Sequence, residues 1–205
     1  MSNILQMKTG IQLLLPFLGE RQYLHGTTLF EALCILLPSD SGVNFKFSRV
    51  ITTNLVKVSW VSSIEEPSAT FSFELDGQSR KVGVYPVALM KLKRIAYLED
   101  LVTERAYFAG ESVQLSKASP YGFVSTLIPL NKMLLKHYIV MSDSFQWLFT
   151  RLDLWKIPES VNPLNLKIES VSQGGKSVKT AVYQGEERLG DLFFSMAEKD
   201  SKHVK

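Results

Sequence analysis

Cysteine is almost missing from this sequence: Cys34 is the single cysteine among 205 residues. One thiol cannot form an internal disulfide or a cysteine-based zinc site, so the fold must be held by burial of apolar side chains. Such cysteine usage is typical of a reducing compartment. We therefore expect a cytoplasmic protein that is stabilised by its core.

Long apolar runs are missing as well. No segment approaches the roughly 20 apolar residues that a membrane span needs. The apolar stretch at residues 11–18 is interrupted by Gln12 and Pro16, and no small-residue cleavage site follows it. We expect neither a secretion signal nor a membrane span.

Charge of one sign is not in large excess. The chain has 23 basic and 20 acidic residues and a net charge of +3, well short of the clustered positive charge that nucleic acids select. The sequence also lacks a glycine-rich phosphate loop, a metal-ligand spacing and a Gly-x-Ser-x-Gly elbow. We expect no nucleic-acid partner, no cofactor and no metal.

What the sequence does contain is typical of a globular protein: 45% of its residues are apolar and 21% are charged, which allows a sizeable core. A typical domain of about 150 residues leaves two options open, one large domain or two small fused ones.

Alternating apolar and polar residues predict antiparallel strands. The alternation is clear at residues 56–60 and 71–75, and Asp76-Gly77 follows the second run. This dipeptide favours a tight hairpin turn, so residues 69–75 should pair with residues 80–85. Residues 27–37 are apolar on most sides and predict a short, buried helix.

The second half gives a similar pattern. Ser142-Asp143-Ser144 resembles a helix start, with Ser142 or Asp143 as the N-cap of a helix that continues to Leu152. We expect strands at residues 112–117, 122–130, 164–171, 177–183 and 189–195.

An internal repeat is also suggested. Tyr23, Phe30 and Leu33 have the same mutual spacing as Tyr138, Phe145 and Leu148, and residues 44–50 align with residues 165–171. The repeat predicts two units, residues 1–108 and 109–205. Chance similarity between two α+β segments is the alternative.

Residues 16–33 resemble the central motif of hotdog-fold β-hydroxyacyl-ACP dehydratases, H-F-P-G-x-P-x-x-P-G-x-x-x-x-E-A-L. With one inserted residue the matches are Phe17, Gly19, Gly26, Glu31, Ala32 and Leu33. The motif covers under a tenth of the chain. Together with the repeat, the resemblance implies an α+β double hotdog, in which two tandem antiparallel sheets each wrap a central helix, as in polyketide synthase dehydratase domains.

The resemblance implies that an acyl thioester lies with its carbonyl near the N-terminus of a central helix. The free N–H groups there would stabilise a developing oxyanion, and Gly26 would allow a close approach. Glu31 aligns with the family's acid or base, and Tyr23 is a candidate substrate contact. The alternatives are that Gly26 simply starts a helix and that Glu31 points outward at a helix edge.

One departure from the family is Pro16, which occupies the place of the catalytic histidine and cannot transfer a proton. His25-Gly26 offers a substitute, because related hotdog thioesterases have a His-Gly pair at this helix entry, followed by an acidic residue. A local cap or a packed side chain is the alternative for His25.

The second half resembles the motif H-P-x-L-L-D-x-x-x-Q of polyketide synthase dehydratases. His137, Asp143 and Gln146 match it, with a spacing from Asp to Gln that is one residue shorter. The resemblance implies that Asp143 is an acid or base and that Gln146 contacts the substrate. The alternative makes Asp143 a helix N-cap.

These residues favour a protein that acts on or binds an acyl thioester of acyl carrier protein or coenzyme A, as a dehydratase or a thioesterase in fatty-acid, polyketide or related metabolism. The basic residues Lys91, Lys93 and Arg94 could attract an acidic carrier protein or simply protect a sheet edge. The rival hypothesis, supported by Pro16, is an inert hotdog that binds an acyl chain or a protein partner. A monomer with pseudo-dimeric halves and a homodimer both remain open.

Overall fold

A computed structural model describes residues 9–37, 39, 41–92, 94–158 and 163–198. The chain divides into two compact units. Unit 1 comprises the chain up to Glu99 together with Arg151–Ile157, and unit 2 comprises Asp100–Thr150 together with the chain from Pro158 onward. The predicted boundary between residues 1–108 and 109–205 divides the chain into two sequence repeats. That division is a different property from the two compact units, and it stays a prediction.

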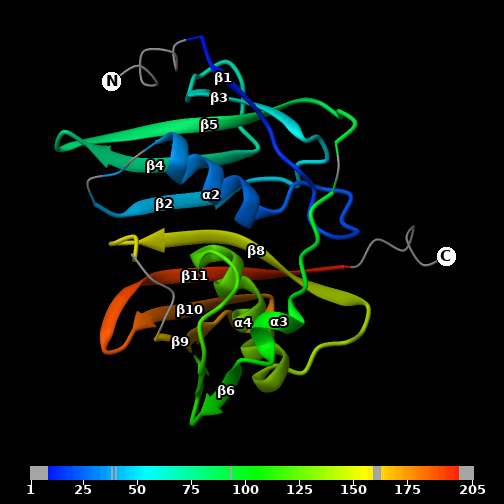
Figure 1. Ribbon diagram of the computed structural model, residues 1–205, viewed down its shortest axis with the longest axis vertical. Coiled ribbons are helices and arrows are strands. Elements are labelled where there is room, and N and C mark those ends of the chain that lie inside the picture. The colour runs from blue at the N-terminus through cyan, green and yellow to red at the C-terminus, as the bar shows by residue number, and fades with distance from the viewer. Residues whose placement is uncertain (1–8, 38, 40, 93, 159–162, 199–205) are drawn as a thin grey trace. The chain divides into compact units, whose positions relative to one another are not determined.

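Within the described residues, unit 1 is an antiparallel sheet with one helix (Figure 1). Its elements are β1 (Ile11–Leu14), α2 (Gly26–Leu36), β2 (Val43–Phe47), β3 (Leu55–Trp60), β4 (Ala69–Leu75) and β5 (Gln78–Ala88). Residues 151–154 of β8 (Phe145–Leu154) complete it. The strand order is β1-β3-β5-β4-β2-β8.

The predicted hairpin is confirmed. Strand β4 pairs with β5 from Ala69↔Val84 to Leu75↔Gln78. The turn residues Asp76 and Gly77 have φ values of 52° and 68°, as the tight turn of an Asp-Gly hairpin requires.

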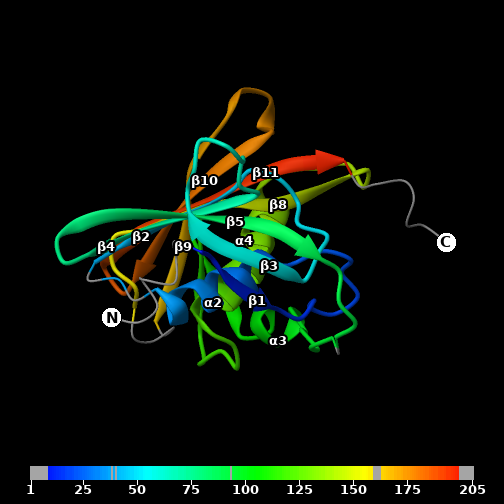
Figure 2. The ribbon, with the colours of Figure 1, turned by 90° about the horizontal axis from the view of Figure 1, so that it is seen from above.

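Helix α2 packs its apolar face on the sheet of unit 1. The Phe30 ring lies edge-on to Phe45 of β2 and Phe71 of β4, with centroid distances of 5.7 and 5.9 Å. Leu29 and Leu33 are completely buried beside it. Figure 2 shows the helix on one side of strands β3, β4 and β5. The predicted buried helix is therefore confirmed, and the core of unit 1 holds its first turn in place.

Unit 2 is also an antiparallel sheet with a long helix. Its elements are α3 (Asp100–Thr103), β6 (Ala106–Ala109), β7 (Ser112–Leu115), α4 (Phe123–Tyr138), residues 145–150 of β8, β9 (Leu164–Val171), the 3-10 turn η1 (Gln173–Gly175), β10 (Ser177–Gln184) and β11 (Glu187–Glu198). The strand order is β8-β11-β10-β9-β7-β6. The strands predicted at 164–171, 177–183 and 189–195 are confirmed.

Two predictions for unit 2 are wrong. Residues 122–130, predicted as a strand, begin α4, because the buried positions of this segment continue at helical spacing to Leu134 and Leu135. Residues 142–152, predicted as a helix, contain a turn and most of β8. The backbone carbonyl of Ser142 accepts the N–H of Phe145 at 3.0 Å, which closes a turn that leads into β8 instead of starting a helix.

The alignment behind the predicted repeat is therefore wrong as well. Tyr23 precedes α2, whereas Tyr138 ends α4. Each unit does have a helix followed by strands, but the last strand lies between different neighbours: β5 between β3 and β4, and β11 between β8 and β10. The α+β class with antiparallel sheets is confirmed for each unit, while an identical strand order is not. No helix within the described residues is long and apolar enough to cross a membrane.

Candidate functional site at the start of helix α2

The chain enters α2 through a buried histidine. His25 is the N-cap residue, with extended backbone (φ −74°, ψ 140°), and its carbonyl accepts the N–H of Leu29. Its side chain is 6% exposed. A buried imidazole at a helix N-terminus is a candidate proton donor or acceptor for a ligand at that end of the helix.

The His25 imidazole is held by the residue two positions later. Nδ1 of His25 lies 2.8 Å from Oγ1 of Thr27, whose side chain is completely buried. This contact fixes the ring plane and occupies Nδ1.

The first amides of α2 are available as hydrogen-bond donors. Within the described residues, no side chain caps this end of the helix, and the N–H of Leu29 makes the first intrahelical bond. The preceding N–H groups, of Gly26, Thr27 and Thr28, point out of the helix end. The positive end of the helix dipole is at the same place, so this end favours an anion or an oxyanion.

Thr28 adds a hydroxyl to this end of the helix. Its Oγ1 atom is shielded from solvent and has no hydrogen-bond partner in the described part of the chain. A shielded hydroxyl without a partner costs free energy, which suggests that a ligand or water completes it. The Gly26-Thr27-Thr28 sequence was used only as a helix-start signal, so sequence reasoning missed Thr28.

Two tyrosines flank the His25 ring. Tyr23, a predicted substrate contact, is half-buried, and its ring centroid is 6.4 Å from that of His25. Tyr97 is 8% exposed, and its ring centroid is 5.7 Å from that of His25. Tyr97 lies on an irregular segment far along the chain, so no sequence signal connects it with this site.

Glu31 lies on the side of α2 away from the sheet. Thr28, Glu31 and Cys34 are three residues apart and therefore share one face of the helix. Leu29 and Leu33 are on the buried face. Glu31 is half-buried. Its exposure therefore does not decide between an acid or base in a site and an outward-pointing side chain at the helix edge. Burial of the Cys34 thiol, and secondly the negative charge of Glu31, raise the pKa of that thiol to about 12. Cys34 is therefore a neutral thiol at physiological pH and not a nucleophile.

The predicted residues of the second half belong to unit 2. Asp143 is exposed in the turn before β8, and Gln146 is a half-buried residue of β8. The N-cap role for Asp143 is wrong, because no helix begins there. His137 lies in the last turn of α4, where its ring stacks on Phe108 at a centroid distance of 4.0 Å.

The basic residues between the predicted units have different environments. Arg94 donates to the carbonyl oxygens of Gly19 and Arg21, at 3.0 and 2.6 Å, and therefore supports local structure. Lys91 is exposed, and Lys93 lies outside the described residues. Pro16 is half-buried just after β1. Among the described residues no group of histidines, cysteines and carboxylates could hold a metal ion.

Comparison with known proteins found no matching family model and no matching curated protein sequence. Several solved structures are similar. A monomeric dehydratase domain from a trans-AT polyketide synthase split module has a TM-score of 0.46 at 10% identity over 92% of this chain and 98% of that one. A putative thioesterase II from Thermobifida fusca YX has a TM-score of 0.42 at 12% identity over 88% of each chain.

The dehydratase domain of RzxB from Pseudomonas fluorescens has a TM-score of 0.43 at 8% identity over 85% of each chain. These are the two protein classes that the sequence resembles, dehydratases and thioesterases. At these TM-scores and identities, the likeness does not assign the chain to either class.

Proposed function

We propose that this protein binds acyl thioesters of acyl carrier protein or coenzyme A and acts on them by hydrolysis or dehydration. The observation that carries the proposal is the start of α2, where the buried imidazole of His25 adjoins the uncapped amides of residues 26–28. Such an arrangement suits a carbonyl group that becomes an oxyanion or enolate in the transition state.

In the proposed complex the thioester carbonyl accepts a hydrogen bond from the N–H of Gly26. One well-placed donor of this kind is worth about 3 kcal/mol in the transition state. Tyr23 and Gln146 contact the substrate. The units form the two halves of a double hotdog, and the acyl chain lies along apolar side chains.

For hydrolysis, a carboxylate takes a proton from water as the water oxygen attacks the carbonyl carbon. The oxyanion then collapses, the C–S bond breaks, and the thiolate leaves and is protonated. In unit 1 Glu31 is the proposed base and His25 an auxiliary group; Asp143, a residue of unit 2, stays a proposed acid or base.

For dehydration, a base removes the proton on the carbon next to the carbonyl, and the enolate oxygen is stabilised by the helix amide. The β-hydroxyl then leaves as water after it takes a proton from an acid. Because Pro16 cannot serve as the base, this route depends on His25, Glu31 or Asp143. Pro16 in place of the family's catalytic histidine also supports the second candidate, an inert protein that binds an acyl chain.

The test uses wild-type protein with acyl and 3-hydroxyacyl thioesters of coenzyme A and of acyl carrier protein, in several chain lengths. Thiol release reports hydrolysis, enoyl-thioester absorbance reports dehydration, and native mass spectrometry reports a bound acyl chain. Glu31→Gln and Asp143→Asn should each lower turnover about 100-fold or more if the carboxylates transfer protons. Acyl binding without turnover would support the inert candidate. The absence of both binding and turnover would refute the proposal.

A further inference from the structure

We infer that residues 94–99 form a strap that positions the His25 imidazole, with Tyr97 as the positioning residue and the Arg21–Glu99 ion pair as its support. The inference rests on the proposed function for what His25 does, but the placement of the ring can be measured without any substrate.

The strap is tied to the segment that leads into α2 by backbone hydrogen bonds. The N–H of Gly19 donates to the carbonyl of Ile95 at 2.9 Å, and the N–H of Ile95 donates to the carbonyl of Phe17 at 3.1 Å. Leu18 and Ile95 form a parallel bridge. A short β-type pairing therefore fixes the strap at the level of residues 17–19.

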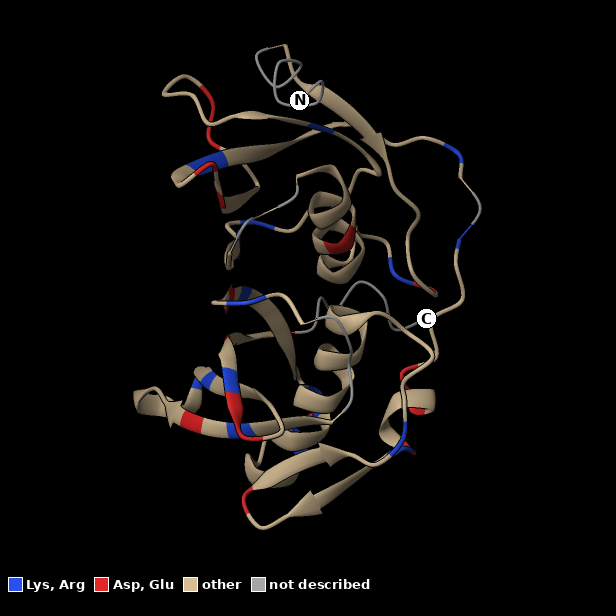
Figure 3. Ribbon diagram, turned by 60° about the vertical axis from the view of Figure 1, so that its left-hand side comes forward, with Lys and Arg blue, Asp and Glu red and all other residues tan. Residues whose placement is uncertain are grey.

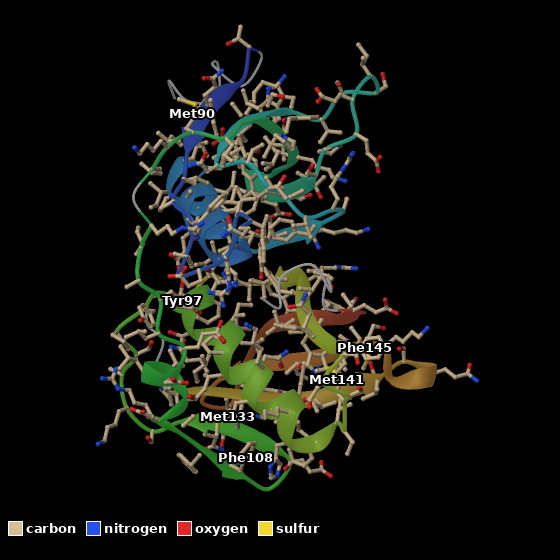
Figure 4. The ribbon with its side chains drawn as sticks, turned by 90° about the vertical axis from the view of Figure 1, so that its right-hand side faces the viewer. Met90, Tyr97, Phe108, Met133, Met141 and Phe145 are labelled. Atoms are coloured by element: carbon tan, nitrogen blue, oxygen red, sulfur yellow. The ribbon has the colours of Figure 1, made fainter. Side chains whose placement is uncertain are left out.

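Side chains reinforce this pairing. The Arg94 guanidinium lies over the Phe17 ring at 5.6 Å, in addition to its hydrogen bonds with the carbonyls of Gly19 and Arg21. Upstream, the buried Asn54 exchanges two hydrogen bonds with the backbone of Met90, at 3.0 and 2.7 Å. Figure 4 shows Met90 and Tyr97 along this part of the chain.

Only one apolar side chain of the strap is inserted into unit 1. Ile95 and Leu98 are 53% and 58% exposed, whereas Tyr97 is 8% exposed and meets the His25 ring. If the strap served general apolar burial, Ile95 and Leu98 would share that burial. Instead the insertion is aimed at the imidazole.

Tyr97 also contacts one partner of an ion pair. The Arg21 guanidinium lies 5.5 Å from the Tyr97 ring centroid and donates to Oε1 of Glu99 at 2.5 Å. Both side chains of this pair are partly shielded, at 21% and 26% exposure. The Tyr97 ring thus contacts both the Arg21 guanidinium and, at an interplanar angle of 50°, the His25 ring, while Thr27 contacts Nδ1 of the imidazole. These contacts restrict rotation of the imidazole.

The orientation of the His25 ring is therefore set by four residues: Thr27, Tyr97, Arg21 and Glu99. A preorganised acid or base is more effective because its geometry is fixed before the substrate arrives. Loss of Tyr97 should release the ring without removing either ring nitrogen. That separates a positioning role from a catalytic one.

The test is NMR of the imidazole nitrogens in protein with 15N-labelled histidine. The chain has only 3 histidines, so His25→Gln and His137→Gln variants assign the signals. In wild type we expect one tautomer for His25 and slow modification by diethyl pyrocarbonate. Tyr97→Leu should give mixed tautomers and about three- to tenfold faster modification. Tyr97→Phe, which keeps the ring, should match wild type.

Glu99→Gln tests the support on a partly exposed site where folding is not at risk, and it should shift the His25 signals in the same direction as Tyr97→Leu, by less. The double exchange Arg21→Glu with Glu99→Arg keeps the ion pair but moves the guanidinium, and should not restore the wild-type signals. Folded Tyr97→Leu and Glu99→Gln proteins with unchanged His25 signals and reactivity would overturn the inference.

Turnover gives a separate reading. In the proposed reaction Tyr97→Leu should lower kcat with little change in KM, because ring placement matters most in the transition state. If wild type turns over no acyl thioester, the proposed function fails while the NMR result still decides the positioning role.

Discussion

The rings of His25 and Tyr97 lie 5.7 Å apart between centroids, although the two residues are far apart in the sequence of unit 1. His25 begins α2, and Tyr97 belongs to the irregular segment that follows β5. The start of α2 is thus contacted by a distant segment of the chain, and no local sequence motif links the two. Its chemistry depends on the folded unit rather than on the motif alone.

Thr28 and Thr27 should respond in opposite ways to loss of the hydroxyl. Thr28 Oγ1 is shielded and has no partner among the described residues, so Thr28→Val should leave the free energy of unfolding unchanged or raise it by up to about 1 kcal/mol. If Thr28 contacts the thioester, the same variant should bind acyl thioesters more weakly. Urea unfolding and ligand titration measure the two effects.

Thr27→Val is the matched control, because it removes the oxygen that contacts Nδ1 of the buried His25. It should lower the free energy of unfolding by about 1–3 kcal/mol. Equal losses of stability in the two variants would contradict the assignment of Thr28 to a ligand.

Cys34 should make stability depend on alkaline pH. Burial, and secondly the charge of Glu31, raise the pKa of the folded thiol from 9.0 to about 12. The neutral thiol favours the folded state, so this contribution is complete below pH 9 and is lost as the pH rises towards 12. Between pH 8 and pH 10 the free energy of unfolding should fall by about 1.4 kcal/mol more in wild type than in Cys34→Ala.

The single cysteine also allows a direct check of reactivity. Ellman's reagent should modify Cys34 of the folded protein at pH 8 far more slowly than the same thiol in urea. Rapid modification of the folded protein would contradict a raised thiol pKa.

Gly42 should tolerate no side chain. A Cβ at this position would lie 2.0 Å from the carbonyl oxygen of Leu154 and 2.6 Å from Cα of Trp155. Backbone atoms cannot move aside as a flexible side chain can, so Gly42→Ala should separate the ends of β2 and β8 and cost more than about 2 kcal/mol. Ser41→Ala, at the exposed neighbouring residue, should cost much less in the same urea unfolding experiment.

Four charged side chains on the sheet of unit 2 form a closed network, in the region where Figure 3 shows acidic and basic residues on neighbouring strands. Lys179 contacts Glu169 and Asp191 at 2.6 and 3.0 Å, and Arg188 contacts the same two carboxylates at 2.7 and 2.6 Å. Both hydrogen-bonded cations lower the pKa of Glu169. Its stabilising contribution is therefore present at neutral pH and is lost as the pH falls through the folded pKa.

Removing the shielded carboxylate should cost more than removing the exposed one. The Asp191 side chain is 12% exposed and that of Glu169 is 36% exposed. Asp191→Asn leaves Lys179 and Arg188 with Glu169 as their one carboxylate in the network and should lower the free energy of unfolding by about 1–3 kcal/mol. Glu169→Gln should cost less, and 1 M salt should reduce its effect further. Equal costs would show that shielding does not govern the network.

The sequence predicted the parts of the fold that local patterns specify. The Asp76-Gly77 turn, the alternation around Phe71 and Phe73, and the apolar stretch of α2 each determine their own structure. The segment at 122–130 failed because a short apolar run suits a buried strand or a buried helix equally well, and packing decides between them. Ser142-Asp143-Ser144 failed because a helix cap and a turn use the same side-chain chemistry.

The candidate site was predicted in the same partial way. His25 and Gly26 were found because they lie within one motif at a helix start. Tyr97, Arg21 and Glu99 were missed, since their contacts join distant segments and carry no periodicity or spacing that a single sequence reveals. Thr28 was missed because an unpartnered hydroxyl is visible only in a folded structure.

The most direct test of the central claim records the backbone amides of α2 while a stable acyl-coenzyme A analogue, with a methylene in place of the thioester sulfur, is titrated into 15N-labelled protein. The carbonyl of this analogue remains a hydrogen-bond acceptor. We predict saturable shifts of the Gly26, Thr27 and Thr28 amide resonances, absent with coenzyme A alone and weakened in Thr28→Val. A bound analogue that leaves these three amides unchanged, or no binding at millimolar concentration for any chain length, would contradict a thioester site at the start of α2.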